Sequence, residues 1–163
     1  MRLTAMLGTV LVVALGVQLG SCSEGHAEQG ARQSLEDEFT KTLETHLRAI
    51  SEKDIETLKS TLVPGDEFFL ILPGSKTVTK RSEFLQSHVD WFQDPTWTYE
   101  YRITHSIIGD RVGIAIVDVM YREPERDGKP YFNHMTLSYG LQRMSGKWFV
   151  IKDHASTIEK TQG

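Results

Sequence analysis

Apolar positions in the first half of the chain recur every three to four residues, which is the spacing of an amphipathic helix. Residues 35–51 carry such a face, and Ser34 is suited to cap the N-terminus of this helix. A second, short helix follows Asp54, and a third is predicted over residues 80–92, before Asp94-Pro95 interrupts the pattern. The face of the first helix comprises Leu35, Phe39, Leu43, Leu47 and Ile50.

The remainder of the chain shows the patterns of strands. The apolar run 68–72 ends at Pro73-Gly74 and predicts a short buried strand, with a small extra strand near Val78. After residue 96, polar and apolar positions alternate, which predicts long strands joined by hairpins. Helices followed by a run of strands indicate an α+β fold in a single domain. The long strands are expected over residues 97–108, 112–122, 131–143 and 148–156, with a loop over 123–130.

The N-terminus has the pattern of an export signal. Arg2 precedes an apolar stretch over residues 5–19, which is long enough for a signal peptide and short for a membrane span. The sequence Leu19-Gly20-Ser21-Cys22 then resembles the lipobox of bacterial lipoproteins. This resemblance implies removal of residues 1–21, lipidation of Cys22, and membrane attachment through the lipid alone.

Residues 22–34 are polar and are expected to form a flexible tether behind the lipidated cysteine. Ser23 follows the cysteine where inner-membrane lipoproteins of Gram-negative bacteria carry Asp, so an outer-membrane location is expected in such a host. The alternative is an ordinary secretory signal, cleaved near Gly25-His26-Ala27, which would give a periplasmic or secreted protein.

Composition and charge argue against several classes of function. Of the 163 residues, 39% are hydrophobic and 25% charged, which is typical of a globular protein. The formal net charge is −4 and no block of Lys or Arg occurs, which argues against nucleic-acid binding. Cys22 is the single cysteine, so no disulfide can form within the chain. We expect neither a metal nor a cofactor, because metal-ligand spacing and nucleotide-binding motifs are absent.

Three groups of residues resemble the NTF2-like superfamily, the cone fold shared with SnoaL-like polyketide cyclases and ketosteroid isomerase. Within it, the similarity is greatest to small bacterial domains related to the calcium/calmodulin kinase association domain. It covers about residues 35–158 and leaves 159–163 as a C-terminal tail. The residues concerned are Leu47-Arg48-Ala49-Ile50 with Asp54, Gly109-Asp110-Arg111-Val112, and Gly146-Lys147-Trp148-Phe149-Val150-Ile151 leading to His154-Ala155-Ser156.

The resemblance implies an α+β cone, in which N-terminal helices pack on a curved, mostly antiparallel sheet that leaves a pocket at its wide end. It also implies a homodimer, because the exposed sheet faces of this superfamily usually pair. Ketosteroid isomerases carry a catalytic Asp before a Pro at the end of the first strand, whereas here Leu72 precedes Pro73. The position of their second acid falls near Ser138, which is not an acid. Steroid isomerisation by that route is therefore not expected.

Strand alternation nominates three acid–base residues. It places His154 on one face of the last strand with Trp148 and Val150, and places His134 and Asp118 on faces of the two preceding strands. If these faces line the pocket, His154, Asp118 and His134 could converge as a general acid and base. Each also has a structural explanation: a hydrogen bond between strands for His154, an ion pair for Asp118, and exposure for His134.

Further residues are candidates for ligand contacts. His46 lies on the first helix, where by position along the fold ketosteroid isomerases place their oxyanion-hole tyrosine. The aromatic residues are expected in the core or the pocket wall, and Arg122 is an arginine that could pair with Asp118. The ligand candidates are His46, Trp91, Tyr99, Tyr101, Arg122 and Ser138.

Three functions therefore stay open. The first is an exported, lipid-anchored domain that binds a small, partly apolar ligand or serves as an assembly module. The second is a cofactor-free isomerase, dehydratase or cyclase that uses a His–Asp pair. The third is a structural homodimer, in which Trp and Tyr side chains would fill the pocket.

Overall fold

The structure is a computed structural model that describes residues 21–162, and for residues 21–24 it describes the backbone alone. The predicted signal peptide and the lipidation of Cys22 therefore lie outside the described part. No helix within residues 21–162 is long and apolar enough to span a membrane.

Three helices and six strands make up the described chain. Their order confirms the predicted run of helix, helix, strand, small strand and helix before four long strands. The elements are α1 (Ser21–Ser51), α2 (Ile55–Thr61), β1 (Glu67–Ile71), β2 (Thr77–Lys80), α3 (Arg81–Trp91), β3 (Thr98–Ile108), β4 (Val112–Arg126), β5 (Lys129–Met144) and β6 (Lys147–Lys160).

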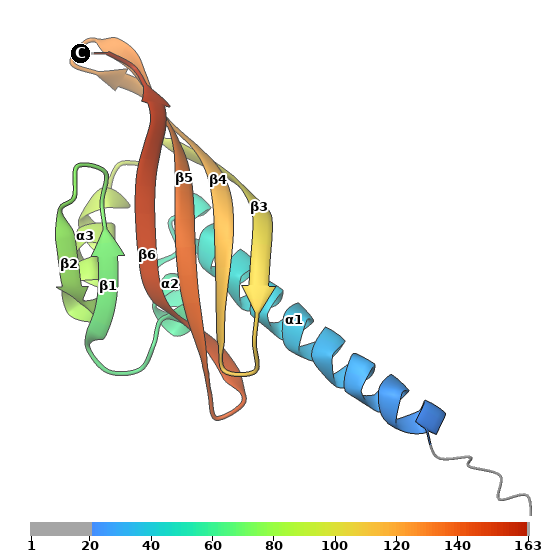
Figure 1. Ribbon diagram of the computed structural model, residues 1–163. Helices are drawn as coiled ribbons and strands as arrows, with labels where there is room; N and C mark the ends of the chain where they lie inside the picture. Colours follow the sequence, from blue (N-terminus) through green and yellow to red (C-terminus); the bar gives the residue numbers. More distant parts are fainter. Residues whose placement is uncertain (1–20, 163) are drawn as a thin grey trace, which may run out of the picture.

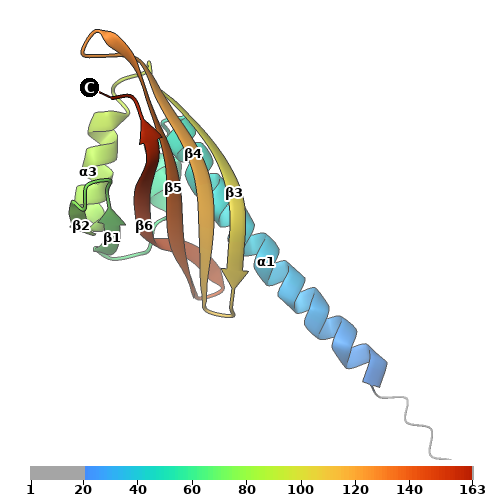
Figure 2. The same cartoon turned by 45° about the horizontal axis from the view of Figure 1, so that its top comes forward.

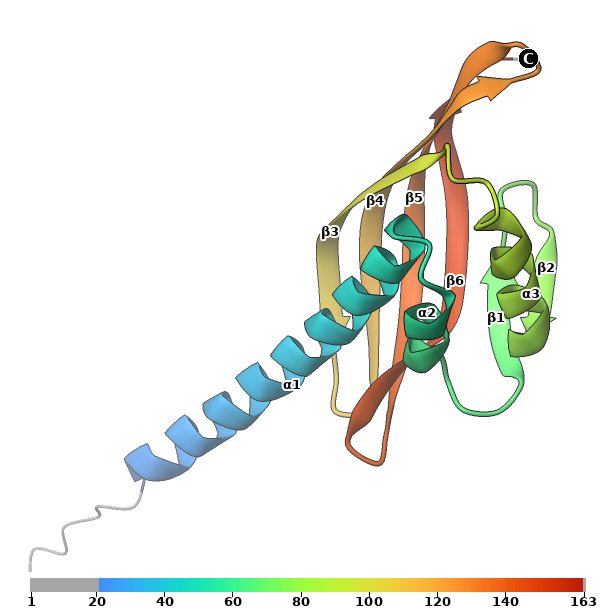
Figure 3. The ribbon, with the colours of Figure 1, turned by 180° about the vertical axis from the view of Figure 1, so that it is seen from behind.

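The six strands form one curved sheet in the order β2-β1-β6-β5-β4-β3. All neighbours are antiparallel except β1 and β6, which run parallel. The three helices lie on one side of the sheet, and no helix of residues 21–162 covers the other side (Figures 1 and 3). Tilting the molecule shows the sheet curving around α1 and α3 (Figure 2). The predicted α+β cone is therefore confirmed, and we call the helix-covered side the inner face.

Helix α1 begins earlier than predicted, so Ser34 is not its cap and residues 25–34 are helical rather than a flexible tether. The helical turns formed by residues 25–34 are exposed and carry no apolar face from which the sequence could predict a helix. Two side-chain contacts at i and i+4 support them, Arg32 to Glu36 at 3.1 Å and Gln33 to Asp37 at 2.9 Å. This half of α1 projects beyond the sheet (Figure 1).

The β4–β5 hairpin is longer than predicted, because the strands continue through most of the expected loop 123–130. Only Asp127 and Gly128 form the turn, and both have positive φ, +55° and +81°. A two-residue hairpin turn requires this conformation, which Asp-Gly adopts readily. The hairpin extends beyond the body of the sheet, on the side where the chain ends (Figure 1).

The inner half of α1 packs directly on the sheet through Phe39. The Phe39 ring is buried and lies edge-on to Trp148, with ring centroids 5.2 Å apart. It also lies against Gly113 in β4, where an added Cβ would approach the ring to 2.5 Å. A glycine at this position therefore allows the helix to approach the sheet closely.

We predict that Gly113→Ala lowers the free energy of unfolding by about 1–3 kcal/mol, because the new methyl group overpacks the contact with Phe39. Urea unfolding followed by circular dichroism measures this. The matched control is Gly30→Ala in the exposed half of α1, where an added Cβ meets nothing within 4 Å. The control should be neutral or stabilising, since alanine favours helix. Equal destabilisation of both variants would contradict the close-approach argument.

Candidate ligand pocket

A β-bulge in β6 decides which side chains face the pocket. Gly140 of β5 pairs with Lys152, whereas the next residue, Leu141, pairs with Val150, so Ile151 is the extra residue. Trp148 and Val150 point to the inner face before the bulge, and Asp153 and Ala155 do so after it. The extra residue thus reverses the alternation, as a bulge does.

The inner face and α3 enclose a cavity of about 420 Å³, within the usual range for small-ligand sites. Its walls are mainly apolar or aromatic. Tyr99, Tyr139 and Asp153 form a buried polar group in it, which we call the inner polar cluster. The lining also includes Leu70, Leu72, Lys76, His88, Trp91, Tyr121, Glu123, Arg126, Asn133, Met135, Leu137 and Ala155.

Asp153 is the unusual residue of the cavity. Its side chain is only 6% exposed, and Oδ1 has no hydrogen-bond partner within the described chain. Burial raises the pKa of Asp153 to about 7, although the Lys152 charge, the His154 amide and the Tyr139 hydroxyl each lower it. The carboxyl group therefore changes protonation near neutral pH while facing a cavity.

Two tyrosines complete the inner polar cluster. Tyr139 is the cross-strand partner of Asp153, and Tyr99 approaches from β3. Neither hydroxyl has a hydrogen-bond partner among residues 21–162. Burial, followed by the nearby charge of Asp153, raises the pKa of both tyrosines, so they remain protonated. The two hydroxyls can therefore donate or accept a hydrogen bond from a bound molecule.

His88 presents an acceptor from α3. Its Nδ1 lies 2.8 Å from the carbonyl oxygen of Phe84, so Nδ1 carries the proton and donates. Nε2 is then unprotonated on a side chain that lines the cavity. Burial lowers the pKa of His88 to about 4, which keeps the ring neutral at physiological pH.

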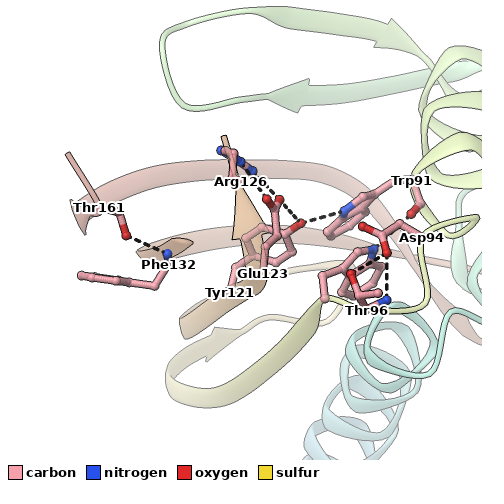
Figure 4. A network of polar contacts seen from close by, with 9 residues as sticks. Trp91, Asp94, Thr96, Tyr121, Glu123, Arg126, Phe132 and Thr161 are labelled. Carbon is pink, nitrogen blue, oxygen red and sulfur yellow. Dashed lines mark hydrogen bonds and ion pairs between the residues drawn. The ribbon is translucent and has the colours of Figure 1, made fainter. Parts of the chain in front are cut away.

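A chain of polar contacts joins four residues of the cavity lining (Figure 4). Trp91 Nε1 donates to the Tyr121 hydroxyl at 3.3 Å, and that hydroxyl donates to Glu123 at 2.6 Å. Arg126 donates to both Glu123 oxygens, and its guanidinium lies over the Tyr131 ring at 3.5 Å. Arg126 foremost, and Tyr121 as well, lower the pKa of Glu123, so this carboxylate stays ionised and its charge is balanced. We call these four residues, Trp91, Tyr121, Glu123 and Arg126, the rim network.

The predicted catalytic trio does not face the cavity. Asp118 and His134 do meet, with 2.7 Å between Oδ1 and Nε2, but on the outer face, where Arg102 also reaches Asp118 at 3.5 Å. His154 lies on the same outer face between β5 and β1, paired with Ser138 and Ile71. The prediction that these strand faces line the pocket was wrong, because it assumed unbroken alternation in β6 and assigned the outer face of β4 and β5 to the pocket.

Of the six predicted ligand residues, Trp91 and Tyr99 line the cavity. His46 is fully buried, and its Nδ1 lies 2.8 Å from Thr61 Oγ1. Burial, with a smaller effect from His88, lowers the pKa of His46 to about 3. The remaining three, Tyr101, Arg122 and Ser138, are outside the lining; Arg122 pairs with Glu100, and Ser138 accepts from Lys152 at 2.8 Å.

The sequence contained one signal for Asp153 that alternation overlooked. Trp148-Phe149-Val150-Ile151 is a run of four apolar residues in a strand whose two faces differ in polarity. Such a run breaks the period of two, and a bulge is one way to accommodate it. His88, Tyr121 and Tyr139 carry no comparable signal. Among residues 21–162 no group of three or more His, Cys, Asp or Glu side chains is arranged to hold a metal ion.

The comparisons identify the family. A family model described as a SnoaL-like domain matches residues 40–159. The chain therefore belongs to the SnoaL-like domains of the NTF2-like superfamily, a class of ligand-binding and isomerase-type folds. None of the curated proteins compared with the chain shows a significant match.

Solved structures support the same fold. An NTF2-like protein with a cystatin-like fold from Novosphingobium aromaticivorans aligns with a TM-score of 0.67 at 12% identity, covering 85% of this chain and 92% of that one. A ketosteroid isomerase-like protein from Erwinia carotovora atroseptica gives 0.64 at 16% identity, covering 76% and 95%. At these identities the similarity establishes the fold and leaves the ligand open.

We predict that Asp153→Asn stabilises the ligand-free protein increasingly as the pH rises from about 4 to about 7, with no further gain above that. The pKa is raised from 3.8 unfolded to about 7 folded, so this carboxyl stabilises the fold below 3.8 and loses that contribution as the pH rises through 7. Asparagine removes the cost of ionising a buried group, on the order of a few kcal/mol.

Urea unfolding of both proteins across this pH range measures the difference. The effects of His46 and His88, whose lowered pKa values favour folding at higher pH, are common to both proteins and cancel. The control is Asp118→Asn on the outer face, which removes a partner of His134 and Arg102 and should not stabilise at any pH. A pH-independent effect of Asp153→Asn would contradict the prediction.

Proposed function

We propose that this protein binds a small, partly apolar molecule in the cavity between the sheet and α3. One observation supports this most directly: the cavity stays open and contains the unpartnered polar atoms of the inner polar cluster. Buried polar groups without partners are costly to a fold, so their presence in a cavity points to a molecule that completes their hydrogen bonds.

A purely structural role fits these observations less well. It would require Trp and Tyr side chains to fill the space between sheet and helix. Trp91 instead stacks on Trp97, with centroids 4.2 Å apart and planes at 14°, and Tyr121 is held in the rim network. The aromatic side chains thus form walls around an open volume of about 420 Å³.

Cofactor-free acid–base catalysis is the second candidate function, with different residues from those predicted. Burial raises the pKa of Asp153 to about 7, and the neutral His88 ring lines the same cavity. A carboxyl that exchanges its proton near neutral pH beside a neutral imidazole is suited to move a proton on a bound substrate. Isomerisation, dehydration and cyclisation are reactions of this kind.

Assembly and location extend the proposal. No helix of the described chain covers the outer face, and at one end this face exposes Ile107, Val112 and Ile114, whose exposed fractions are 74%, 51% and 51%. Apolar side chains exposed together favour pairing with a second copy of the chain. The proposed homodimer would be exported and attached to the membrane through Cys22.

A matched pair of substitutions tests the pocket. Ala155 lines the cavity, whereas its neighbour Ser156 points to the outer face, so Ala155→Leu fills the pocket and Ser156→Leu adds the same bulk elsewhere. We expect small-molecule fragments that bind the parent protein, detected by ligand-observed NMR, to lose binding about tenfold or more in Ala155→Leu alone. Equal binding by both variants would place the ligand outside this cavity.

The proposed lipid anchor at Cys22 is tested separately from the pocket. We predict that the protein purified with detergent from its own host begins at Cys22 and carries the mass of attached acyl chains. Cys22→Ser should abolish the added mass and leave the protein unanchored. Intact-mass spectrometry distinguishes this result from an unmodified chain that begins after Ala27, which would contradict lipidation.

A further inference from the structure

The cavity lining includes buried acceptor atoms that have no partner within residues 21–162. Asp153 Oδ1 and Asn133 Oδ1 are buried without a partner within the described chain, and both atoms accept hydrogen bonds. His88 Nε2 is a third acceptor, because its ring proton is on Nδ1. The two tyrosine hydroxyls of the inner polar cluster serve as acceptors as well as donors. A molecule that satisfies this cavity therefore supplies N–H or O–H groups.

Two of the three cationic groups near the cavity are engaged by other side chains. Arg126 is held by both oxygens of Glu123 and lies over Tyr131, so its charge is balanced within the rim network. Lys152 is adjacent to Asp153 in the chain, but its side chain lies on the outer face, where it donates to Ser138. Lys76 lines the cavity from the turn between β1 and β2. None of these side chains forms an ion pair with Asp153 in the described part of the chain.

Aromatic rings surround the remaining volume. Trp91 and Tyr121 line the cavity from the rim network, and Tyr99 and Tyr139 line it from the inner polar cluster. The faces of such rings attract cations, most strongly where water is excluded. A buried carboxylate among aromatic rings combines the two features that recognise an organic ammonium.

We propose that the ligand is an organic amine bound as its ammonium ion, with Asp153 accepting an N–H hydrogen bond and the apolar part lying against Leu70, Met135 and Leu137. This inference rests on the proposed small-molecule function of the cavity and specifies its ligand class. The ammonium supplies N–H donors to acceptor atoms that have no hydrogen-bond partner within the described chain. It also offsets the cost of an ionised carboxylate in a buried position.

The proposal fixes the sign of the pH dependence of binding. The titratable groups that line the cavity with Asp153 are His88 on α3, Lys76 in the β1–β2 turn, the tyrosines of β3, β4 and β5, and Glu123 with Arg126 on β4. His46 on α1 lies outside the lining and packs against Tyr139. The histidines stay neutral and Glu123 stays ionised at neutral pH. Asp153 is thus the group that titrates near pH 7, and an ammonium binds its ionised form.

Three probes of the same shape test the ligand class on the full mature protein: 2-phenylethylamine, 2-phenylethanol and phenylacetate. Calorimetry at about pH 6 and about pH 8 brackets the Asp153 titration. We expect the amine to bind more tightly than the alcohol and the carboxylate, with an affinity that increases about tenfold from the lower to the higher pH. A neutral ligand that required protonated Asp153 as a donor would show the opposite slope.

Asp153→Asn and Asp118→Asn form the matched pair. Asp153→Asn should weaken amine binding about 30-fold or more, abolish its pH dependence, and leave 2-phenylethanol binding within a few-fold of the parent. Asp118→Asn, on the outer face, should leave all three probes unchanged. The unfolding measurements described above show whether each variant is folded.

The outcomes separate this inference from the function on which it rests. If the alcohol or the carboxylate binds as well as the amine, and Ala155→Leu abolishes that binding, the cavity is a ligand site but the amine class is wrong. If amine binding is insensitive to Asp153→Asn, the proposed contact is wrong. If none of the probes binds the parent protein, both this inference and the pocket function are overturned.

Discussion

The extra residue in β6 determines the chemistry that this molecule presents to a ligand. With strict alternation, the strand would turn Lys152 and His154 inward beside Trp148 and Val150. Ile151 interrupts that order, so Asp153 enters the cavity and Lys152 and His154 go to the outer face. A bulge is a local backbone feature, but here it exchanges the residue types on two faces of a sheet at once. The burial of Asp153, its raised pKa and its place beside Tyr139 all depend on it.

The two faces of the sheet differ in how their charges are neutralised. On the outer face, Asp118 meets His134 and Arg102, and Arg122 meets Glu100, so carboxylates are paired within reach of water. On the inner face, the rim network balances Glu123 with Arg126, but Asp153 has no such partner in the described chain. The protein tolerates an unpaired carboxyl where it borders a cavity. This asymmetry is the physical reason for assigning ligand recognition to the inner face.

The order of elements followed from the sequence because helical and strand periods are long and repeated there. Phe39, Leu43 and Leu47 fix one face of α1, and the alternation of β4 assigns every second side chain to the core. Local breaks in the helical or strand period were harder to predict from the sequence. The polar turns of α1 before Leu35 lack an apolar face, and one residue in β6 reverses the strand. The candidate site was therefore placed on the wrong face although its residue types, a carboxyl and a histidine, were anticipated.

The N-terminal half of α1 projects from one end of the domain. It leaves the sheet at the end opposite the β4–β5 hairpin (Figure 1), and β4 carries Glu123 and Arg126 of the cavity lining. Ten residues of helix, 25–34, extend about 15 Å. A chain held at its N-terminus by a helix of this kind would carry Glu123 and Arg126 of the cavity lining on the side away from its attachment point. Molecules would then reach that side of the lining from the surrounding solution rather than from the surface that holds the helix.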